Sequence, residues 1–370
     1  MSLIASTFRL FGQALFALLS FVLLLIALCL FALGLGIGVG TGLSGGELSA
    51  LPDSGGLSYR YLAGNPRSPN RLLSVLVTGP ILGSPEDELS SWMSLGGVTY
   101  GYQVQDLLRK AAQDASIKGV LLHLQTPGGT IFGSRAIHEG IKAYQQASGR
   151  PVLVYIEGLA ASGGVMAMVG ADAIYADHGS LIGSIGVLGA ELVYFDRPVA
   201  IDGGLLGGGI VTEGGIEQTV ISAGRGKDLG NPFRRPSADE IRNLQNGVNN
   251  EYTAFVHLVA EQRNIDEAVI REQMGAQVFD NQTAQAYGLI DGTLSRNQAI
   301  ARLAELARLG PGDYQLVRAQ NGGGRFLQRL LGAMSGQPRP DTAAQVQAQI
   351  CQTAVRLPLV YYGDLTSLCR

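Results

Sequence analysis

The chain has 370 residues, of which 46% are hydrophobic and 15% are charged. This composition excludes intrinsic disorder and supplies enough apolar material for a packed core. The net charge of −3, with Lys and Arg scattered along the chain, argues against a nucleic-acid-binding protein. The 52 glycines follow no strict three-residue period, so they are expected at turns and close backbone approaches rather than in a collagen-like repeat.

Residues 1–40 have the pattern of a cytoplasmic N-terminus followed by a membrane anchor. No charged residue stands between Arg9 and Glu47, and the most apolar stretch runs from Ala14 to Leu35. A helix of about 20 residues spans a hydrocarbon core about 30 Å thick, whereas a cleaved secretory signal has an apolar part of only about 7–15 residues. We therefore predict one uncleaved transmembrane helix, with a cleaved signal as the alternative. The positive charge of Arg9 orients the bulk of the chain away from the cytoplasm.

Residues 41–70 are rich in Gly, Ser, Pro and Asn and are expected to form a flexible stalk. From residue 71 to residue 308, short apolar runs alternate with stretches in which apolar residues recur at helical spacing. Strands are expected at 72–77, 119–124 and 151–156, helices near 104–111 and 134–147, and a loop at 157–161. This alternation predicts βαβ units and therefore an α/β domain with a mostly parallel sheet.

A longer helix is expected near the end of this domain. Ser237 and Glu240 have the spacing of a capping box, in which each residue satisfies a backbone N–H of the other. Behind them, apolar residues from Ile241 to Val259 follow a helical stripe. The pattern predicts a helix that faces the core.

Residues 309–370 are expected to form a linker and a C-terminal tail, because the regular patterns weaken there. Cys351 and Cys369 lie in this tail, whereas Cys29 lies within the apolar N-terminal run. The two tail cysteines could close a disulfide loop in an oxidising compartment or remain free thiols. Their spacing does not fit a metal site.

Two glycine-rich segments carry the candidate chemistry, because functional loops of α/β folds follow the carboxyl ends of strands. The first, Thr126–Thr130, contains paired glycines whose N–H groups could stabilise an oxyanion, although a plain turn uses the same residues. The second surrounds Ser162 with Ala and Gly at a predicted strand-to-helix turn. Ser162 is therefore a candidate nucleophile in the manner of a nucleophile elbow. The alternative is that it caps the following helix.

A serine nucleophile needs a base. Among the four histidines, only His178 falls in a predicted loop, and the sequence indicates no carboxylate that would orient it. Lys227 lies in a glycine-flanked stretch after an apolar run. A lysine can serve as a base when burial disfavours its ammonium form, so Lys227 is either such a base or a solvated surface lysine.

Residues 70–305 resemble the signal peptide peptidase A family of Ser/Lys membrane proteases, in its short single-module form. The resemblance rests on five motifs in one order: Thr126–Gly129, Ala161–Gly164, Gly183–Val187, Ala223–Asp228 and Gln285–Asp291. It implies a ClpP/crotonase-like fold. It further implies that Ser162 is the nucleophile and Lys227 the general base, that Gly129 and Gly163 donate the oxyanion-hole N–H groups, and that Ser184 helps to hold Lys227.

Two departures from the family pattern affect the expected site. Val165-Met166 follows Ser162-Gly163-Gly164 where the family usually has an aromatic residue, so the substrate preference is open. The glycine-rich stretch 202–209 resembles an insertion between Ser162 and Lys227, and it would change the mouth of the site.

The resemblance implies a membrane-anchored serine endopeptidase that cleaves apolar peptides such as spent signal peptides. It would be a single-pass protein of the plasma (inner) membrane with its catalytic domain outside the cytoplasm, and it needs no cofactor or metal. In double-length relatives the lysine and serine belong to different modules, so we expect a homo-oligomeric ring in which Lys227 of one protomer meets Ser162 of the next. The alternatives are a catalytically inactive membrane scaffold, which would not need both residues, and a crotonase-type acyl-CoA enzyme, which would not need the anchor.

Overall fold

A computed structural model describes residues 57–85, 97–196, 216–320, 351 and 359–363. The chain divides into two compact units, and all the described residues lie in the second unit, residues 56–370. The predicted transmembrane helix and the glycine-rich stretch 202–209 lie outside the described residues. None of the helices in the described ranges has both the length and the apolar character that a membrane crossing requires. Cys351 is disulfide-bonded, and its partner lies outside the described residues.

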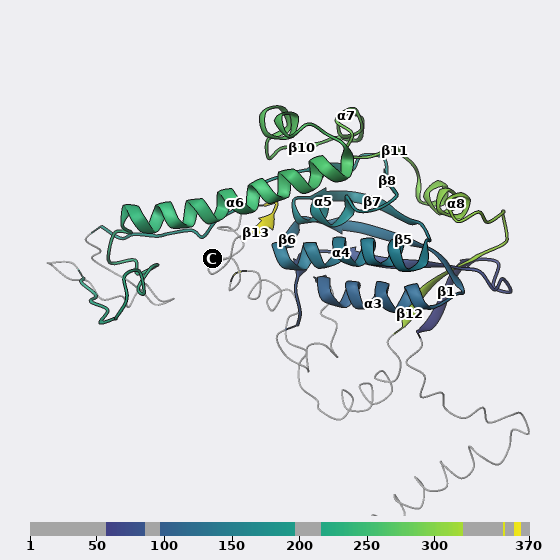
Figure 1. Ribbon diagram of the computed structural model, residues 1–370, viewed down its shortest axis with the longest axis horizontal. Coiled ribbons are helices and arrows are strands. Elements are labelled where there is room, and N and C mark those ends of the chain that lie inside the picture. The colour runs from purple at the N-terminus through teal and green to yellow at the C-terminus, as the bar shows by residue number, and fades with distance from the viewer. Residues whose placement is uncertain (1–56, 86–96, 197–215, 321–350, 352–358, 364–370) are drawn as a thin grey trace, which may run out of the picture. The chain divides into compact units, whose positions relative to one another are not determined.

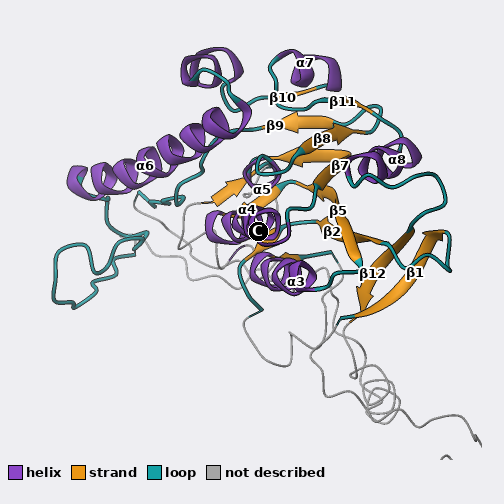
Figure 2. Cartoon of the chain, turned by 45° about the vertical axis from the view of Figure 1, so that its right-hand side comes forward, coloured by secondary structure: helices purple, strands orange, loops and turns teal. Residues whose placement is uncertain are grey.

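The main sheet is mostly parallel, as the sequence predicts (Figure 2). Its strand order is β1 (Ser58–Gly64), β12 (Gln315–Gln320), β2 (Arg71–Thr78), β5 (Ile117–Thr126), β7 (Val152–Ala161), β8 (Ala173–Ala176) and β11 (Gly292–Thr293). Every neighbouring pair along this order is parallel except β1 with β12. The last residues of β7 also pair with β9 (Leu181–Gly183), which pairs with β10 (Val278–Phe279). Parallel strands covered on both faces are expected to contain continuous apolar runs, and residues 119–122 of β5 and 152–156 of β7 form such buried runs.

A second, smaller sheet lies beside the ends of the central strands. Its order is β13 (Leu359–Tyr361), β6 (Gly128–Thr130), β3 (Ile81–Leu82) and β4 (Thr99–Tyr100). β6 follows directly on β5, so the first glycine-rich segment of the sequence connects the two sheets.

Helices cover both faces of the main sheet (Figure 1). On one face lie α3 (Gly101–Gln113), α4 (Ile131–Ser148) and α5 (Gly163–Met168), and on the other lies α8 (Arg296–Leu306). Because successive strand residues point to opposite faces, Leu122 of β5 packs toward α4 and α5, whereas Leu121 packs toward α8. Burying a leucine completely stabilises the fold by about 1.5–3 kcal/mol.

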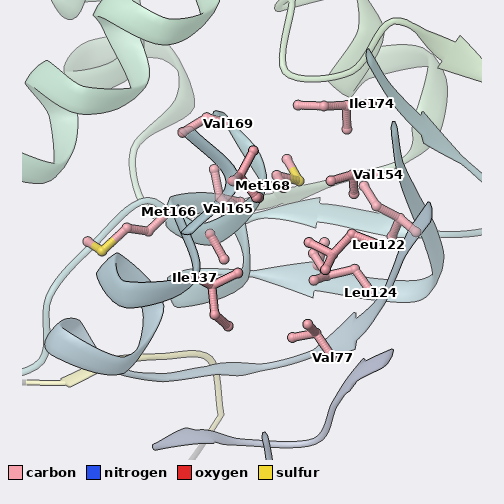
Figure 3. Packing of buried hydrophobic residues seen from close by; sticks show 14 of the residues in the cluster. Val77, Leu122, Leu124, Ile137, Val154, Val165, Met166, Met168, Val169 and Ile174 are labelled. Atoms are coloured by element: carbon pink, nitrogen blue, oxygen red, sulfur yellow. The ribbon is translucent and has the colours of Figure 1, made fainter. Parts of the chain in front are cut away.

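The short helix α5 is buried along its whole length. Its side chains, such as Val165 and Met168, pack against Leu122 and Leu124 of β5 and Val154 of β7 (Figure 3). Interiors packed in this way transmit strain and allow little displacement. The core therefore fixes the position of the residue that precedes α5.

The remaining helices extend the domain beyond the sheet. They are α6 (Ala238–Arg263), a short π-helix η1 (Val269–Met274) and α7 (Asn281–Ala286). The predicted capping box at Ser237 and Glu240 is present and starts α6. The expected core-facing stripe is correct only for the C-terminal half of α6, because its buried residues lie between Phe255 and Val259 and Ile241 is half exposed.

Three stretches expected to be irregular form strands instead. Residues 58–64, within the predicted stalk, form β1, and they pair with β12, which lies within the predicted linker and tail. The expected loop 157–161 is the continuation of β7, which pairs there with β9. In each case the pairing partner is distant in the sequence or itself short, so no local pattern indicates the strand.

Candidate active site

Ser162 lies at the carboxyl end of β7, where the strand turns into α5. Its backbone has φ 54° and ψ −110°, a conformation that costs a non-glycine residue about 1–3 kcal/mol. The turn is held by the Ser162 amide, which donates to the Gly183 carbonyl at 2.8 Å, and by the buried helix behind it. A strained turn of this kind is found where a side chain must be presented for reaction.

The Ser162 hydroxyl does not cap α5, although Ser162 occupies the N-cap position. Its Oγ lies 3.4 Å from the carbonyl oxygen of Gly186, which is a long and weak hydrogen bond. The alternative that Ser162 serves to cap the following helix is therefore wrong for its side chain. The hydroxyl is left with weak internal contacts, as a nucleophile requires.

The two glycine-rich segments meet beside Ser162. A Cβ added to Gly128 would lie 2.6 Å from the Gly163 amide nitrogen, and one added to Gly129 would lie 2.0 Å from the Ile81 carbonyl oxygen. Gly128 also has φ 96°, which other residues rarely adopt. Glycine is needed at these positions because the backbone of Gly163 and of Ile81 lies too close to leave room for a side chain. This close approach brings the amides of the two glycine-rich segments together.

Two neighbours of the Gly128, Gly129 and Gly163 backbone were not identified from the sequence. Ser134 of α4 is fully buried, and its Oγ has no hydrogen-bond partner among the described residues. A Cβ added to Gly163 would lie 2.3 Å from this Oγ. The strand β13 pairs with β6, with Val360 opposite Gly129. Neither feature has a recognisable pattern in the sequence, because Ser134 is a single polar residue within a predicted helix and β13 is three residues of the predicted tail.

Lys227 lies in an exposed segment that precedes α6, and within the described part of the chain its side chain forms no hydrogen bond or ion pair. Ser184, which is buried with φ 57°, donates its amide to the Gln277 carbonyl at 2.6 Å. No hydrogen bond in the described ranges links either residue to the other or to the side chain of Ser162. The structure thus brings Ser162, Gly129 and Gly163 together and leaves Lys227 outside the group.

A charged cluster holds the segment that carries Lys227. The Arg234 guanidinium donates to both carboxylate oxygens of Asp228 at 2.7 and 2.8 Å and to Glu240 at 2.7 and 2.9 Å. These hydrogen bonds lower the pKa of Asp228 and lower the pKa of Glu240 to about 2, and they raise the pKa of Arg234. The cluster is therefore fully charged at neutral pH and ties the residue after Lys227 to the first turn of α6.

The histidines do not supply a base to Ser162. His178 is exposed, and its Nδ1 lies 3.4 Å from Asp177 in a loop after β8. Burial lowers the pKa of His138 to about 4. His123 contacts Glu157, and His257 contacts Glu267. Within the described ranges no group of His, Cys, Asp and Glu residues could hold a metal ion.

A serine at a strained strand-to-helix turn, beside glycine backbone that can face an oxyanion, has the geometry that α/β enzymes with a nucleophilic serine use. Comparison with known proteins shows which family this part of the chain is similar to. Residues 144–310 match the model of peptidase family S49. The resemblance to signal peptide peptidase A inferred from the motifs is confirmed.

Several relatives carry protease names. A candidate protease of Methanocaldococcus jannaschii is 34% identical over 204 residues, which are 55% of this chain and 61% of the relative. A candidate signal peptide peptidase SppA of Enterococcus faecium is 26% identical over 304 residues, 80% of this chain and 83% of the relative. Protease 4 of Haemophilus influenzae is 29% identical over 238 residues, but this chain spans only 35% of its length.

Two solved structures have a similar course of the chain. A mutant of the 1510-N membrane-bound stomatin-specific protease is 17% identical, with a TM-score of 0.37, and the match covers 65% of this chain and 86% of that one. A mutant of ClpP1 from Listeria monocytogenes is 13% identical, with a TM-score of 0.36, and the match covers 61% and 94%.

Proposed function

We propose that the protein is a serine endopeptidase in which Ser162 is the nucleophile and Lys227 the general base. The observation that carries the proposal is the backbone of Ser162, which is held at φ 54° without its hydroxyl capping the helix that follows. Strain of this kind persists only where the surrounding structure enforces it. The family match of residues 144–310 supports the same role.

The proposed reaction is acyl transfer through the serine. The Ser162 Oγ attacks the carbonyl carbon of a peptide bond while the neutral Lys227 amine takes the hydroxyl proton. The N–H groups of Gly129 and Gly163 stabilise the oxyanion, and the proton then passes to the leaving amine. A water molecule, activated by the same lysine, hydrolyses the acyl-enzyme and regenerates the serine.

We further propose that the lysine comes from a neighbouring protomer. Lys227 has no contact with the Ser162 group, and the segment that carries it is tied to the exposed N-terminal half of α6. Exposed apolar side chains surround this segment and could be covered by a second copy: Val193, Phe195, Val220, Ile221, Leu229 and Ile241. A repeated head-to-tail contact closes into a ring.

The proposed substrates are apolar peptides, including spent signal peptides, at the plasma (inner) membrane. The apolar run from Ala14 to Leu35 supports an anchor with the catalytic domain outside the cytoplasm. The name of the Enterococcus relative is consistent with such substrates. The proposed fold type is ClpP/crotonase-like, with no cofactor.

A fluorophosphonate probe tests the proposal, because it reacts only with an activated serine. We expect labelling of the full-length, detergent-solubilised protein at Ser162, together with cleavage of apolar peptides. Ser162→Ala should lose both, whereas Ser134→Ala, which removes the neighbouring buried hydroxyl, should keep the labelling at Ser162. A folded protein that shows neither labelling nor cleavage would favour the inactive scaffold.

A further inference from the structure

One edge of the main sheet carries two arginines on the face where α8 lies. α8 packs against β5 and β7, whereas β1 and β12 form the far edge of the sheet (Figure 2). Leu316 of β12 is buried in the apolar cluster with α8, so Arg318, two residues further along the strand, points to the same face. Arg60 of β1 is paired directly with Arg318 in the antiparallel ladder. Residues paired in this way have their side chains on one face, so the two arginine side chains are neighbours.

Neither arginine has a counterion among the described residues. The side chains of Arg60 and Arg318 form no ion pair and no hydrogen bond with any group in these ranges. Like charges directly opposite each other destabilise a sheet. The Nε atom of Arg318 is also buried without a partner, and an unsatisfied buried donor of a charged group is costly. An oxyanion bound between the two side chains would remove both costs.

The other charged groups on this face are already paired. His123 of β5 and Glu157 of β7 point to the same face as Leu121 and Tyr155 of the α8 cluster. Arg296 donates to both carboxylate oxygens of Glu157 at 2.6 and 2.8 Å, and the Nε2 atom of His123 lies 2.5 Å from the same carboxylate.

The histidine adds no negative charge and shows that the positive charge of Arg318 reaches it. Burial lowers the pKa of His123, and the charges of Arg296 and Arg318 lower it further, against the attraction of Glu157. Because Glu157 is neutralised by Arg296, the two unpaired arginines give this edge of the face an excess of positive charge.

An exposed leucine borders the two arginines. Leu76 of β2 is 36% exposed and points to the same face as Leu72, which is fully buried in the α8 cluster. β2 is the strand next to β12, so apolar and cationic surface adjoin. Guanidinium groups bind phosphate oxygens in pairs. A ligand that satisfies both parts of this surface has a phosphate group attached to an aliphatic group.

We propose that Arg60, Arg318 and Leu76 form a binding site for the headgroup of an anionic phospholipid, with its phosphate between the two guanidinium groups. The inference rests on the proposed membrane anchor. Residues 36–57, which are 22 in number, separate the apolar run that ends at Leu35 from β1, and they span at most about 75 Å.

The tether explains why two arginines are sufficient. A short flexible linker holds the site at an effective lipid concentration in roughly the millimolar range. Each basic residue near an anionic surface strengthens association about fivefold. The site therefore turns the edge formed by β1 and β12 toward the membrane and orients the catalytic domain on it.

The first test measures how fast arginines react with phenylglyoxal in the full-length protein, reconstituted in nanodiscs of phosphatidylcholine with or without phosphatidylglycerol. Phosphatidylglycerol should slow the modification of Arg60 and Arg318 about tenfold if the site is occupied in about 90% of the molecules. Salt at about 1 M, where the Debye length is about 3 Å, should restore the rate. Arg109 of α3, whose exposed side chain pairs with Asp106, should react equally fast in both kinds of nanodisc.

Substitutions identify the side chains that form the site. Arg318→Gln should abolish the protection of Arg60, whereas Arg109→Gln, the matched control, should leave it unchanged. Arg60 is exposed, so Arg60→Gln provides the same test through the protection of Arg318 if Arg318→Gln does not fold. Equal rates in the two kinds of nanodisc, or protection of Arg60 that survives Arg318→Gln, would overturn the inference.

A second measurement requires neither the anchor nor catalysis. In calorimetric titration of the detergent-solubilised protein, dihexanoyl phosphatidylglycerol should bind about tenfold more tightly than inorganic phosphate, because its aliphatic part covers Leu76. Leu76→Ser should remove this preference without weakening the binding of phosphate. Equal affinities of the two ligands would make this a site for free anions, and tighter binding of a hexaglutamate peptide would assign it to a protein partner. Either result makes the inference wrong.

The titration also separates this inference from the proposed function. If the N-terminus proves to be cleaved, or if the protein cleaves no peptide, while the lipid still binds more tightly than phosphate, the anchor or the peptidase proposal fails and the headgroup site stands. If peptides are cleaved but the lipid does not bind, the headgroup site is wrong and the peptidase proposal stands.

Discussion

At the scale of single residues, the site depends on a backbone conformation rather than on an unusual side chain. Ser162 is one of four non-glycine residues with positive φ in the described ranges. Ser184, the residue that follows β9, is another. β9 pairs with the end of β7, so both serines lie at the same edge of the sheet. The fold stores strain at this edge and offsets it with the buried packing of α5.

Substitutions of Lys227 test the base directly. Ser162→Ala and Lys227→Ala should each abolish cleavage, and the double variant should be no worse than either, because the two residues act as one unit. Lys227→Arg should be inactive at every pH, since a guanidinium stays protonated. A lysine accepts a proton only when neutral, so kcat/KM of the unsubstituted protein should rise with pH.

The measurement is a pH profile of peptide cleavage with circular dichroism as the control for folding. An active Lys227→Arg variant would remove the lysine from the mechanism. If His178→Ala were inactive and Lys227→Ala active, the base would be the histidine instead.

At the scale of elements, α6 has two functions along its length. Its C-terminal half packs into the core through residues such as Phe255 and Val259, whereas its N-terminal half contributes Glu240 to the cluster around Arg234. A guanidinium with paired hydrogen bonds to two carboxylates has a defined geometry that a lysine cannot reproduce. The cluster therefore positions Asp228 and, next to it, Lys227.

Arg234→Gln should lower kcat by about tenfold or more with little change in KM, because a small displacement of a catalytic group is costly. Arg234→Lys should restore only part of the loss. Arg242→Gln is the matched control, since Arg242 forms an exposed ion pair with Asp239 in the same turn of α6, and such pairs contribute about 0–1 kcal/mol. Because the pKa of Glu240 is about 2, the loss should be the same at pH 6 and pH 9 after correction for the lysine profile. Equal effects of the two glutamine variants would assign the cluster to stability alone.

At the scale of the whole molecule, we propose that a second copy completes the site, because Lys227 does not contact the Ser162 group within one chain. Inactive Ser162→Ala and Lys227→Ala subunits, dissociated and reassembled in equal amounts, should regain activity, because about a quarter of head-to-tail interfaces would pair an intact serine with an intact lysine. Mixing Ser162→Ala with the double variant is the control, since it contains no intact serine. Pairing within one chain predicts no recovery at any ratio, which peptide cleavage across a series of mixing ratios would reveal.

The amino-acid sequence by itself determined the class of the fold and the segments that carry the candidate site residues. Apolar runs of strand length at 72–77, 119–124 and 151–156 all became parallel strands, since burial on both faces demands a local pattern that can be read directly. The capping box at Ser237 was equally local. Small residues after a strand are a local signal too, and they indicated the two glycine-rich segments, whereas the family resemblance assigned roles to Ser162, Gly129 and Gly163. The structure brings these three residues together.

Only the tertiary structure decided which distant segments pair and what each candidate residue contacts. β1 joins β12 across more than 250 residues, and β13 pairs with β6 at Gly129, although neither β1 nor β13 has a distinctive pattern of its own. The stripe on α6 predicted burial that only half of the helix obtains, because periodicity shows which face is apolar and not what covers it. The strained φ of Ser162 and the isolation of Lys227 arise from packing between elements, and no property of a single segment contains them.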